Sequence, residues 1–233
     1  MTRLIECVPN FSEGRDIIII NKIAESVSKV SGIKVLDIYT GADTNRTVIT
    51  FAGTPDDVTE AAFRGMKTAS ELIDMSRHKG KHPRIGATDV CPLIPLKGIS
   101  MEETVEYAHK LAKRAGEELN IPVYCYEYAA FSGERRNLEN IRAGEYEGLR
   151  NKMSSPGGKP DFGPNEWSDR VEKTGAVIIG ARNYLIAFNI NLNTDSVKIA
   201  KDIAADIRES GRIDYNSGKT GNSIQKVTKG VEA

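Results

Sequence analysis

The stretch TVITFAGTPDDVTEAAFRGMKTASELI, residues 47–73, joins a strand pattern directly to a helix pattern. Residues 47–51 are rich in β-branched and aromatic side chains, which favour a strand. A helix start follows: Thr54 can cap it, Pro55 suits its first turn, and Asp56 and Asp57 are favourable beside its positive end. The apolar stripe of that helix, at helical spacing, consists of Val58, Ala61, Ala62, Met66, Ala69, Leu72 and Ile73. The stretch therefore predicts a strand followed by an amphipathic helix.

The same alternation continues on both sides of this stretch. Residues 4–8, 33–39 and 89–94 have strand patterns, and residues 16–30 have helical spacing that ends before Gly32. The resulting order is β-α-β-β-α-β, the split βαβ or ferredoxin-like pattern. We therefore expect an α/β (α+β) fold whose first subdomain is ferredoxin-like.

Further elements extend this unit toward the C-terminus. A capping box at Ser100–Glu103 opens a strong helix over residues 104–119, and a short strand follows at 122–126. The remaining expectations are a mostly polar helix at 137–152, a loop rich in proline and glycine at 153–167, strands at 176–179 and 185–192, and a helix at 195–209. We expect a first subdomain over residues 1–179, with this extra helix and strand, and a shorter α/β unit over residues 180–233.

Composition excludes several classes of function. The chain has 233 residues, and its 32 basic residues balance 32 acidic ones, so no overall field attracts nucleic acid or an anionic membrane. No run approaches the roughly 20 apolar residues of a membrane span, and residues 1–15 lack the apolar core of a signal peptide. Cys7, Cys91 and Cys125 form no CxxC pair, which indicates reduced thiols and a cytoplasmic location. A buried structural cysteine is the simplest interpretation of Cys91, with a nucleophile as the alternative.

Residues 75–95, MSRHKGKHPRIGATDVCPLIP, concentrate polar chemistry between the second helix and the fourth strand. They hold two of the three histidines of the chain, and Gly80 and Pro83 make a continuous helix through them unfavourable. The segment is therefore expected to be a loop at the edge of a rigid sheet, where binding groups commonly lie.

A metal site is the weakest interpretation of this loop. His78 and His82 are four residues apart, but a zinc site needs a third ligand, and Lys79 and Lys81 between them would repel a dication. We expect no metal. Nucleic-acid binding also fits poorly, because no aromatic residue is interleaved for base stacking.

Two other interpretations of the loop remain open. Its cations, Arg77, Lys79, Lys81 and Arg84, could bind an anion, or could simply form a solvated basic loop. A histidine with a reference pKa of about 6.5 could instead act as a general base near neutral pH.

Polar groups also occur at the corresponding ends of other predicted strands. Asn10 follows the first strand, Asn45 and Arg46 precede the third, and Asn189 and Asn191 alternate along a late strand so that both amides share one face. Each could instead cap a turn. The chain contains no P-loop, GxGxxG or GxSxG motif, which disfavours phosphoryl transfer and dinucleotide chemistry.

Five stretches together resemble the glutamate formiminotransferase family, which includes the amino-terminal domain of formiminotransferase-cyclodeaminase. They are ECVPNFSEGR, DTNRTV, DMSRHKGKHPRIGATDVCPLIP, PDFGP and LIAFNINL. The resemblance implies transfer of a formimino group from N-formimino-L-glutamate to N5 of tetrahydrofolate, in histidine degradation and one-carbon metabolism. It also implies two α/β subdomains with tetrahydrofolate, a cosubstrate, in a groove or tunnel between them.

The resemblance assigns roles to individual positions. The histidine followed by Pro-Arg, His82, would be the catalytic acid/base. Candidate substrate-binding residues are Asn10, Asn45, Arg46, His78, Arg84, Asn189 and Asn191, and candidate folate-binding residues are Gly163, Pro164, Asn165 and Gly175. His78 is also expected to support the loop. The partners implied are folate and formiminoglutamate, with a homodimer as the assembly and neither nucleic acid nor membrane as a partner.

Two departures from the family pattern leave alternatives open. The family has an aspartate two residues after the position of Asp37, where this chain has Tyr39. The family also continues beyond the position of Ala233, so residues 180–233 are expected to be an incomplete second subdomain, either part of a longer protein or a reduced half. The rival hypotheses are a folate-binding protein without transferase activity and a related activity on 5-formyltetrahydrofolate.

Overall fold

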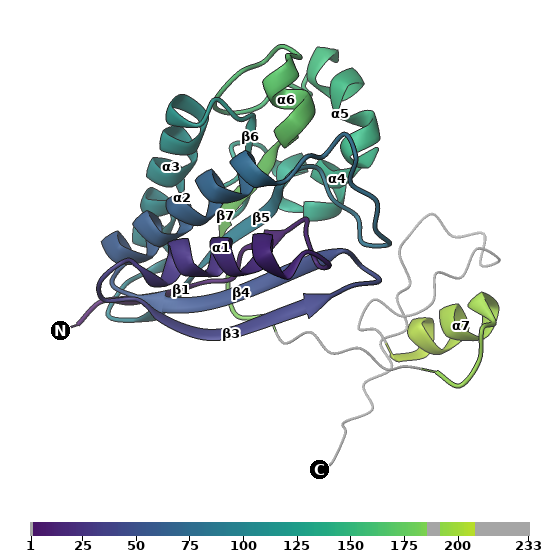
Figure 1. Ribbon diagram of the computed structural model, residues 1–233, viewed down its shortest axis with the longest axis horizontal. Helices are drawn as coiled ribbons and strands as arrows, with labels where there is room; N and C mark the ends of the chain where they lie inside the picture. The colour runs from purple at the N-terminus through teal and green to yellow at the C-terminus, as the bar shows by residue number, and fades with distance from the viewer. Residues whose placement is uncertain (1, 186–191, 208–233) are drawn as a thin grey trace, which may run out of the picture. The chain divides into compact units, whose positions relative to one another are not determined.

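The computed structural model describes residues 2–185 and 192–207 (Figure 1). Contacts divide the chain into two compact units, Met1–Tyr184 and Leu185–Ala233. This division falls slightly later than the boundary expected from the sequence, and the assignment of the two parts to subdomains stays a prediction. The described part of the second unit contains helix α7 (Val197–Ile207), which confirms the helix expected there.

The first unit combines a mixed sheet with helices on both faces. Its strands are β1 (Leu4–Cys7), β2 (Asn10–Phe11), β3 (Lys34–Gly41), β4 (Arg46–Gly53), β5 (Thr88–Lys97), β6 (Val123–Glu127) and β7 (Val177–Ala181). Its helices are α1 (Ile17–Ser28), α2 (Pro55–Leu72), α3 (Met101–Glu118), the 3-10 turn η1 (Gly133–Arg136), α4 (Leu138–Arg142), α5 (Glu145–Ser154) and α6 (Asp169–Thr174).

Strand order confirms the ferredoxin-like prediction. β1 and β2 are two parts of one interrupted strand, because both pair antiparallel with β4 on one side and with β5 on the other. β3 pairs with the free side of β4. The resulting order β3-β4-β1/β2-β5 is that of a β-α-β-β-α-β unit, and β7 and β6 extend it in parallel beyond β5.

The main core lies between the sheet and α1, α2 and α3, which cover one of its faces (Figure 1). The stripe expected on α2 is buried there: Val58, Ala61, Met66 and Ala69 are no more than 1% exposed. Burial of Val58 and of Met66 contributes about 1.5–3 kcal/mol each relative to full exposure. Thr54 caps α2, since its side-chain oxygen accepts from the backbone N–H of Asp57 at 3.4 Å.

A second core covers the opposite face of β5, β7 and β6. Val90, Ile178 and Tyr124 point into it from the three strands, and Leu149 and Met153 of α5 pack against them. Because side chains alternate along a strand, their sequence neighbours point into the main core. This end of the sheet is therefore sandwiched between two helical layers.

Two details of the helices differ from the sequence prediction. Residues 137–152 form two helices instead of one, because Gly144 and Glu145 both have positive φ (84° and 52°) and interrupt the helical path. Helix α6 was not expected. The strand expected at 185–192 lies almost wholly outside the described residues. Within the described ranges, no helix is long and apolar enough to span a membrane.

Strand direction gathers several loops at one edge of the sheet. β5, β6 and β7 run parallel, and β4 runs with them because both β4 and β5 are antiparallel to β1/β2. All four therefore begin at the same edge. Arg46 begins β4, His82 lies in the segment before β5, and Gly163 follows Phe162, which is bonded to the first residue of β6.

Candidate active site

The connection between α2 and β5, residues 73–87, is here called the histidine loop. Backbone contact holds it against the turn before β4: a Cβ at Gly80 would lie 2.3 Å from the carbonyl oxygen of Thr44. His78 Nε2 donates to the carbonyl oxygen of Asn45 (3.0 Å), and Asn45 Nδ2 donates to that of Lys79 (3.0 Å). Asn45 itself has a left-handed backbone with φ of 48°. His78 and Asn45 thus fix the loop by bonding to the protein.

His82 lies half-buried in this loop with its two nitrogens differently engaged. Nδ1 contacts the carbonyl oxygen of Pro83 at 2.7 Å, and because that oxygen can only accept, Nδ1 carries the hydrogen. Nε2 therefore accepts from Nη1 of Arg46. The pKa of His82 is lowered to about 4, first because burial disfavours the imidazolium and then because Arg46 and Arg142 lie nearby. The ring is neutral at physiological pH.

Arg46 begins β4 and faces the same side of the sheet as Tyr39. Tyr39 pairs with Val48, and Val48 and Arg46 are two residues apart on one strand, so all three share a face. Burial and the charge of Arg142 lower the pKa of Arg46, whereas Asp89 and Tyr39 oppose that shift. Arg46 is thus a partly desolvated cation beside His82.

Arg46→Ala is expected to raise the pKa of His82 from about 4 toward the ordinary 6.5, because a nearby positive charge is removed and the site opens to water. A titration of the His82 imidazole by nuclear magnetic resonance measures the shift. Arg136→Ala, at an exposed arginine of η1, is the matched control and should leave the titration unchanged. An unaltered His82 titration in Arg46→Ala would contradict the arrangement described here.

Asp89 and Arg142 complete the site, and the sequence-based reasoning missed both. Asp89 is 2% exposed; it accepts from Nη2 of Arg142 and from the backbone N–H of Ile85 at 3.0 Å. Burial raises its pKa, and the charge of Arg142 opposes that shift. A carboxylate at the start of the buried strand β5, directly before its apolar run, was a usable signal for Asp89. Arg142 gave none, because it lies in a mostly polar segment and reaches the site only through tertiary packing.

Most of these groups converge on one small pocket at the sheet edge. Its lining residues are Ser12, Thr44, Asn45, Arg46, His78, His82, Arg84 and Asp89. The pocket therefore brings together five of the residues expected from the sequence to form the site: Asn45, Arg46, His78, His82 and Arg84.

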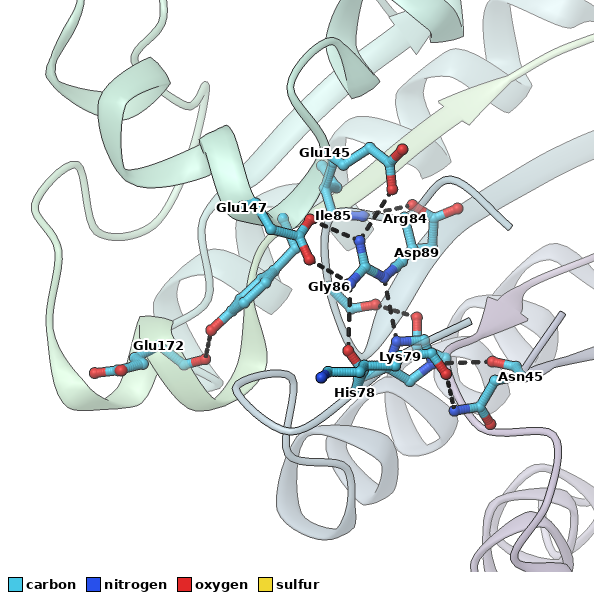
Figure 2. A network of polar contacts seen from close by, with 12 residues as sticks. Asn45, His78, Lys79, Arg84, Ile85, Gly86, Asp89, Glu145, Glu147 and Glu172 are labelled. Carbon is cyan, nitrogen blue, oxygen red and sulfur yellow. Dashed lines mark hydrogen bonds and ion pairs between the residues drawn. The ribbon is translucent and has the colours of Figure 1, made fainter. Parts of the chain in front are cut away.

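Arg84 links the histidine loop to α5 (Figure 2). Its Nη1 donates to Glu145 (2.9 Å) and Glu147 (2.8 Å), its Nη2 to Glu147 (2.7 Å) and to the carbonyl oxygen of His78 (3.3 Å), and its Nε to His78 Nδ1 (3.2 Å). All five N–H groups thus have protein acceptors. Arg84 would have to exchange one of these partners to hold a substrate carboxylate, although an open hollow of about 560 Å³ adjoins it.

The other candidate residues that the structure describes lie outside the pocket. Asn10 donates to the carbonyl oxygen of Val8 at 3.2 Å. Gly163, Pro164 and Asn165 follow Phe162, whose carbonyl oxygen bonds to the start of β6. Gly175 is buried against the histidine loop, and Asn189 and Asn191 lie outside the described residues.

The three cysteines are buried in the sheet. Cys7 and Cys91 are buried on neighbouring strands with their sulfurs 3.5 Å apart, and burial raises the pKa of Cys7 well above its ordinary value. Burial also raises the pKa of Cys125 to about 12. Across residues 2–185 and 192–207, no three histidine, cysteine or acidic side chains are grouped as metal ligands.

The fold and the pocket together define a class: a mixed α/β protein with a neutral histidine among arginines, suited to proton transfer on anionic ligands. Comparison with known protein families identifies the family within this class. The family described as the formiminotransferase domain, N-terminal subdomain, matches residues 4–182, and the chain belongs to this family.

Curated relatives agree with this assignment. The chain is 48% identical over 207 residues to a glutamate formimidoyltransferase of Thermoplasma acidophilum, covering 88% of this chain and 67% of the relative. It is 50% identical over 212 residues to the formimidoyltransferase-cyclodeaminase of Mus musculus, covering 91% of this chain and 38% of the relative. The chain thus spans about two fifths of the length of the cyclodeaminase relatives that it matches.

Proposed function

We propose that the chain transfers a formimino group from N-formimino-L-glutamate to N5 of tetrahydrofolate. The observation that carries the proposal is His82, a neutral imidazole whose Nε2 lone pair points to Arg46 in a pocket shared with Asp89. A neutral histidine can accept a proton, and the neighbouring arginines suit two substrates that both carry carboxylates.

The residues of the site divide the chemistry between them. The tetrahydrofolate cosubstrate supplies N5, to which the formimino carbon becomes bonded as its bond to the glutamate nitrogen breaks. His82 Nε2 takes the proton lost from N5 and returns it to the departing nitrogen. In the structure, the Nε2 lone pair of His82 accepts a hydrogen bond from Arg46. A substrate carboxylate that accepts from Arg46 in its place would free this lone pair to take a proton. The same carboxylate would raise the pKa of His82 and so make the imidazolium accessible.

Folate contacts are proposed at Gly163, Pro164 and Asn165. These residues lie beside the start of β6, at the same sheet edge as the histidine loop. Gly163 has a φ of 80°, and a Cβ there would lie 2.2 Å from the carbonyl oxygen of Ile121, so the turn requires glycine. Gly175 is a further candidate folate contact.

A transfer assay on the purified chain tests the proposal. Formiminoglutamate and tetrahydrofolate are mixed with the protein, and the formimino-folate and glutamate formed are quantified by mass spectrometry. Equal amounts of both products support the proposal. Binding of both substrates without transfer would overturn it in favour of a folate-binding protein.

Tyr39 is the specific observation that favours that second candidate. A carboxylate at this position, which shares a face with Arg46, would stabilise the imidazolium of His82, whereas tyrosine is uncharged at neutral pH. Tyr39 is 60% exposed, so its replacement costs little packing.

Tyr39→Asp is therefore expected to raise kcat near neutral pH by about threefold and at most tenfold, because a shift of about one unit in the pKa of His82 acts on the rate through its Brønsted dependence. Steady-state kinetics between pH 5 and 9 measure it, and Tyr39→Asn is the uncharged control. Equal rates in the aspartate and asparagine variants would show that positions 39 and 82 do not act together.

Assembly and location belong to the same proposal. We infer a homodimer in the cytoplasm from the family resemblance and from three thiols that are free in the structure. Sedimentation equilibrium of the purified chain tests the dimer, and a monomer at micromolar concentration would contradict it.

A further inference from the structure

We propose that Arg142, together with Arg46, binds the α-carboxylate of the formimino donor beside His82. This inference rests on the proposed function. It assigns a role to a residue that no sequence motif marked, and it names which of the two donor carboxylates the arginine pair recognises.

The charge balance of the site is the first argument. Arg46 and Arg142 both act on His82, and the charge of each is felt in a partly desolvated region. Among the residues that the structure describes, Asp89 is the one carboxylate bonded to Arg142, and His82 is neutral. Two cations and one anion leave one positive charge uncompensated, which is unfavourable away from water. A carboxylate from a ligand would balance it.

Unused hydrogen-bond donors are the second argument. Nε of Arg46 and Nε of Arg142 are both buried without a protein acceptor in the described part of the chain. Within residues 2–185 and 192–207, Arg46 donates through Nη1 alone, to His82, and Arg142 through Nη2 alone, to Asp89. Arg84, by contrast, has an acceptor for every N–H. The free donors of Arg46 and Arg142 match the paired oxygens of a carboxylate.

The placement of Arg142 is built into the fold. Lys152 of α5 donates to the carbonyl oxygens of Asn140 and Ile141, immediately before Arg142, at the end of α4. Asp89, held by the N–H of Ile85, then orients the guanidinium. Asp89 is therefore a positioning residue, and Arg142 is held rigidly enough to recognise one carboxylate geometry.

The chemistry of the donor selects the α-carboxylate. The formimino group is attached to the α-nitrogen of glutamate, so the α-carboxylate carbon is two bonds from the atom that must receive a proton. His82 has to approach that nitrogen, and Arg46 contacts His82 directly. A carboxylate beside the imidazole is consequently the α-carboxylate, while the γ-carboxylate extends away.

Two donors separate the carboxylates experimentally. N-formimino-4-aminobutyrate is the natural donor without its α-carboxylate. For the unaltered chain, kcat/KM is expected to fall roughly 100-fold with this donor, as for loss of charge-assisted hydrogen bonds. With the natural donor, Arg142→Gln should lower kcat/KM by a similar factor. With N-formimino-4-aminobutyrate, Arg142→Gln should lower kcat/KM by less than about threefold relative to the unaltered chain, because this donor lacks the carboxylate that Arg142 would bind. If the loss from Arg142→Gln were as large with N-formimino-4-aminobutyrate as with the natural donor, the proposal would be overturned.

Titration of His82 with L-glutamate gives a readout that does not need turnover. Glutamate, which carries the same α-carboxylate, should raise the His82 pKa measured by nuclear magnetic resonance in the unaltered chain but not in Arg142→Gln. Arg136→Gln, at an exposed arginine of η1, should behave like the unaltered chain. If Arg142→Gln fails to fold, Arg142→Lys, which keeps the charge without the paired donors, replaces it and should show a weakened response.

The two proposals fail in different ways. A chain that transfers from neither donor but shows the glutamate-dependent shift, lost in Arg142→Gln, would refute transferase activity and support the carboxylate site. A chain that transfers normally while Arg142→Gln responds to glutamate as the unaltered chain does would refute the site and leave the proposed function intact.

Discussion

His82→Ala is expected to lower kcat for formimino transfer by roughly 100-fold or more, while folate binding changes little. The imidazole is the titratable group whose unprotonated nitrogen faces the arginine pair, so its loss removes proton acceptance and proton return together. Its side chain is only half-buried, and removing it leaves the main core untouched. Steady-state kinetics with both substrates measure the effect.

A matched histidine variant separates chemistry from folding. His109 on α3 donates to the carbonyl oxygen of Ala129 at 2.9 Å, far along the chain from the histidine loop. His109→Gln retains a donor and should preserve kcat. An unchanged kcat in His82→Ala would remove His82 from the mechanism.

The pH dependence of kcat/KM tests the direction in which the pKa of His82 is shifted. A general base must be neutral, and burial with two nearby cations lowers the pKa of His82 to about 4. Because kcat/KM reports the free enzyme, its acid limb from His82 should lie near pH 4 and not near 6.5. An acid limb near 6.5 that disappears in His82→Ala would show that the arginines do not act on the imidazole in solution.

Local patterns were enough to predict most of the fold. The structure confirms the capped, amphipathic helix predicted at α2 and the strand predicted at β4. The apolar face of α2 is buried, and the side chains of β4 alternate between buried and partly exposed. The sequence also placed His82 on a loop at a sheet edge. Long-range pairing followed from the β-α-β-β-α-β order, which admits few topologies.

The groups that surround His82 were predictable only in part. Arg46 lies directly before the strand predicted at residues 47–51 and was identified. Arg142 is the last residue of α4, directly before the break between α4 and α5. This break depends on positive φ at Gly144 and Glu145. A glutamate with positive φ has no clear sequence signal, so neither the break nor the reach of Arg142 could be expected from local patterns.

Residue type also failed to distinguish binding from scaffolding. Asn45, His78 and Arg84 were expected to bind substrate, and the structure shows each of them hydrogen-bonded to the protein. Their direct contact with substrate stays a prediction. What their bonds do establish is a cross-linked histidine loop, tied to the turn before β4 and to α5 (Figure 2).

Gly175, expected to contact folate, could instead act by holding the backbone of the histidine loop in place. Its backbone, with φ of 63° and ψ of −151°, lies in a region that is essentially restricted to glycine. A Cβ there would lie 2.2 Å from the carbonyl oxygen of Ile85 and 2.5 Å from the Cα of Gly86. Neither backbone atom can move aside without displacing the histidine loop, because the Ala176 N–H donates to that same Ile85 oxygen at 3.0 Å.

Gly175→Ala is therefore expected to lower the free energy of unfolding by about 3 kcal/mol or more, the sum of backbone strain and overpacking. The midpoint of urea unfolding measures it. Gly148→Ala is the matched control: it lies within α5 with nothing within 4 Å of an added Cβ, and alanine there should stabilise the chain by about 0.5–1 kcal/mol. If Gly175→Ala unfolded at the original urea concentration but bound folate more weakly, Gly175 would be a folate contact and not a scaffold. A stability loss with transfer activity reduced in proportion would instead show that this glycine acts by holding the histidine loop against β7.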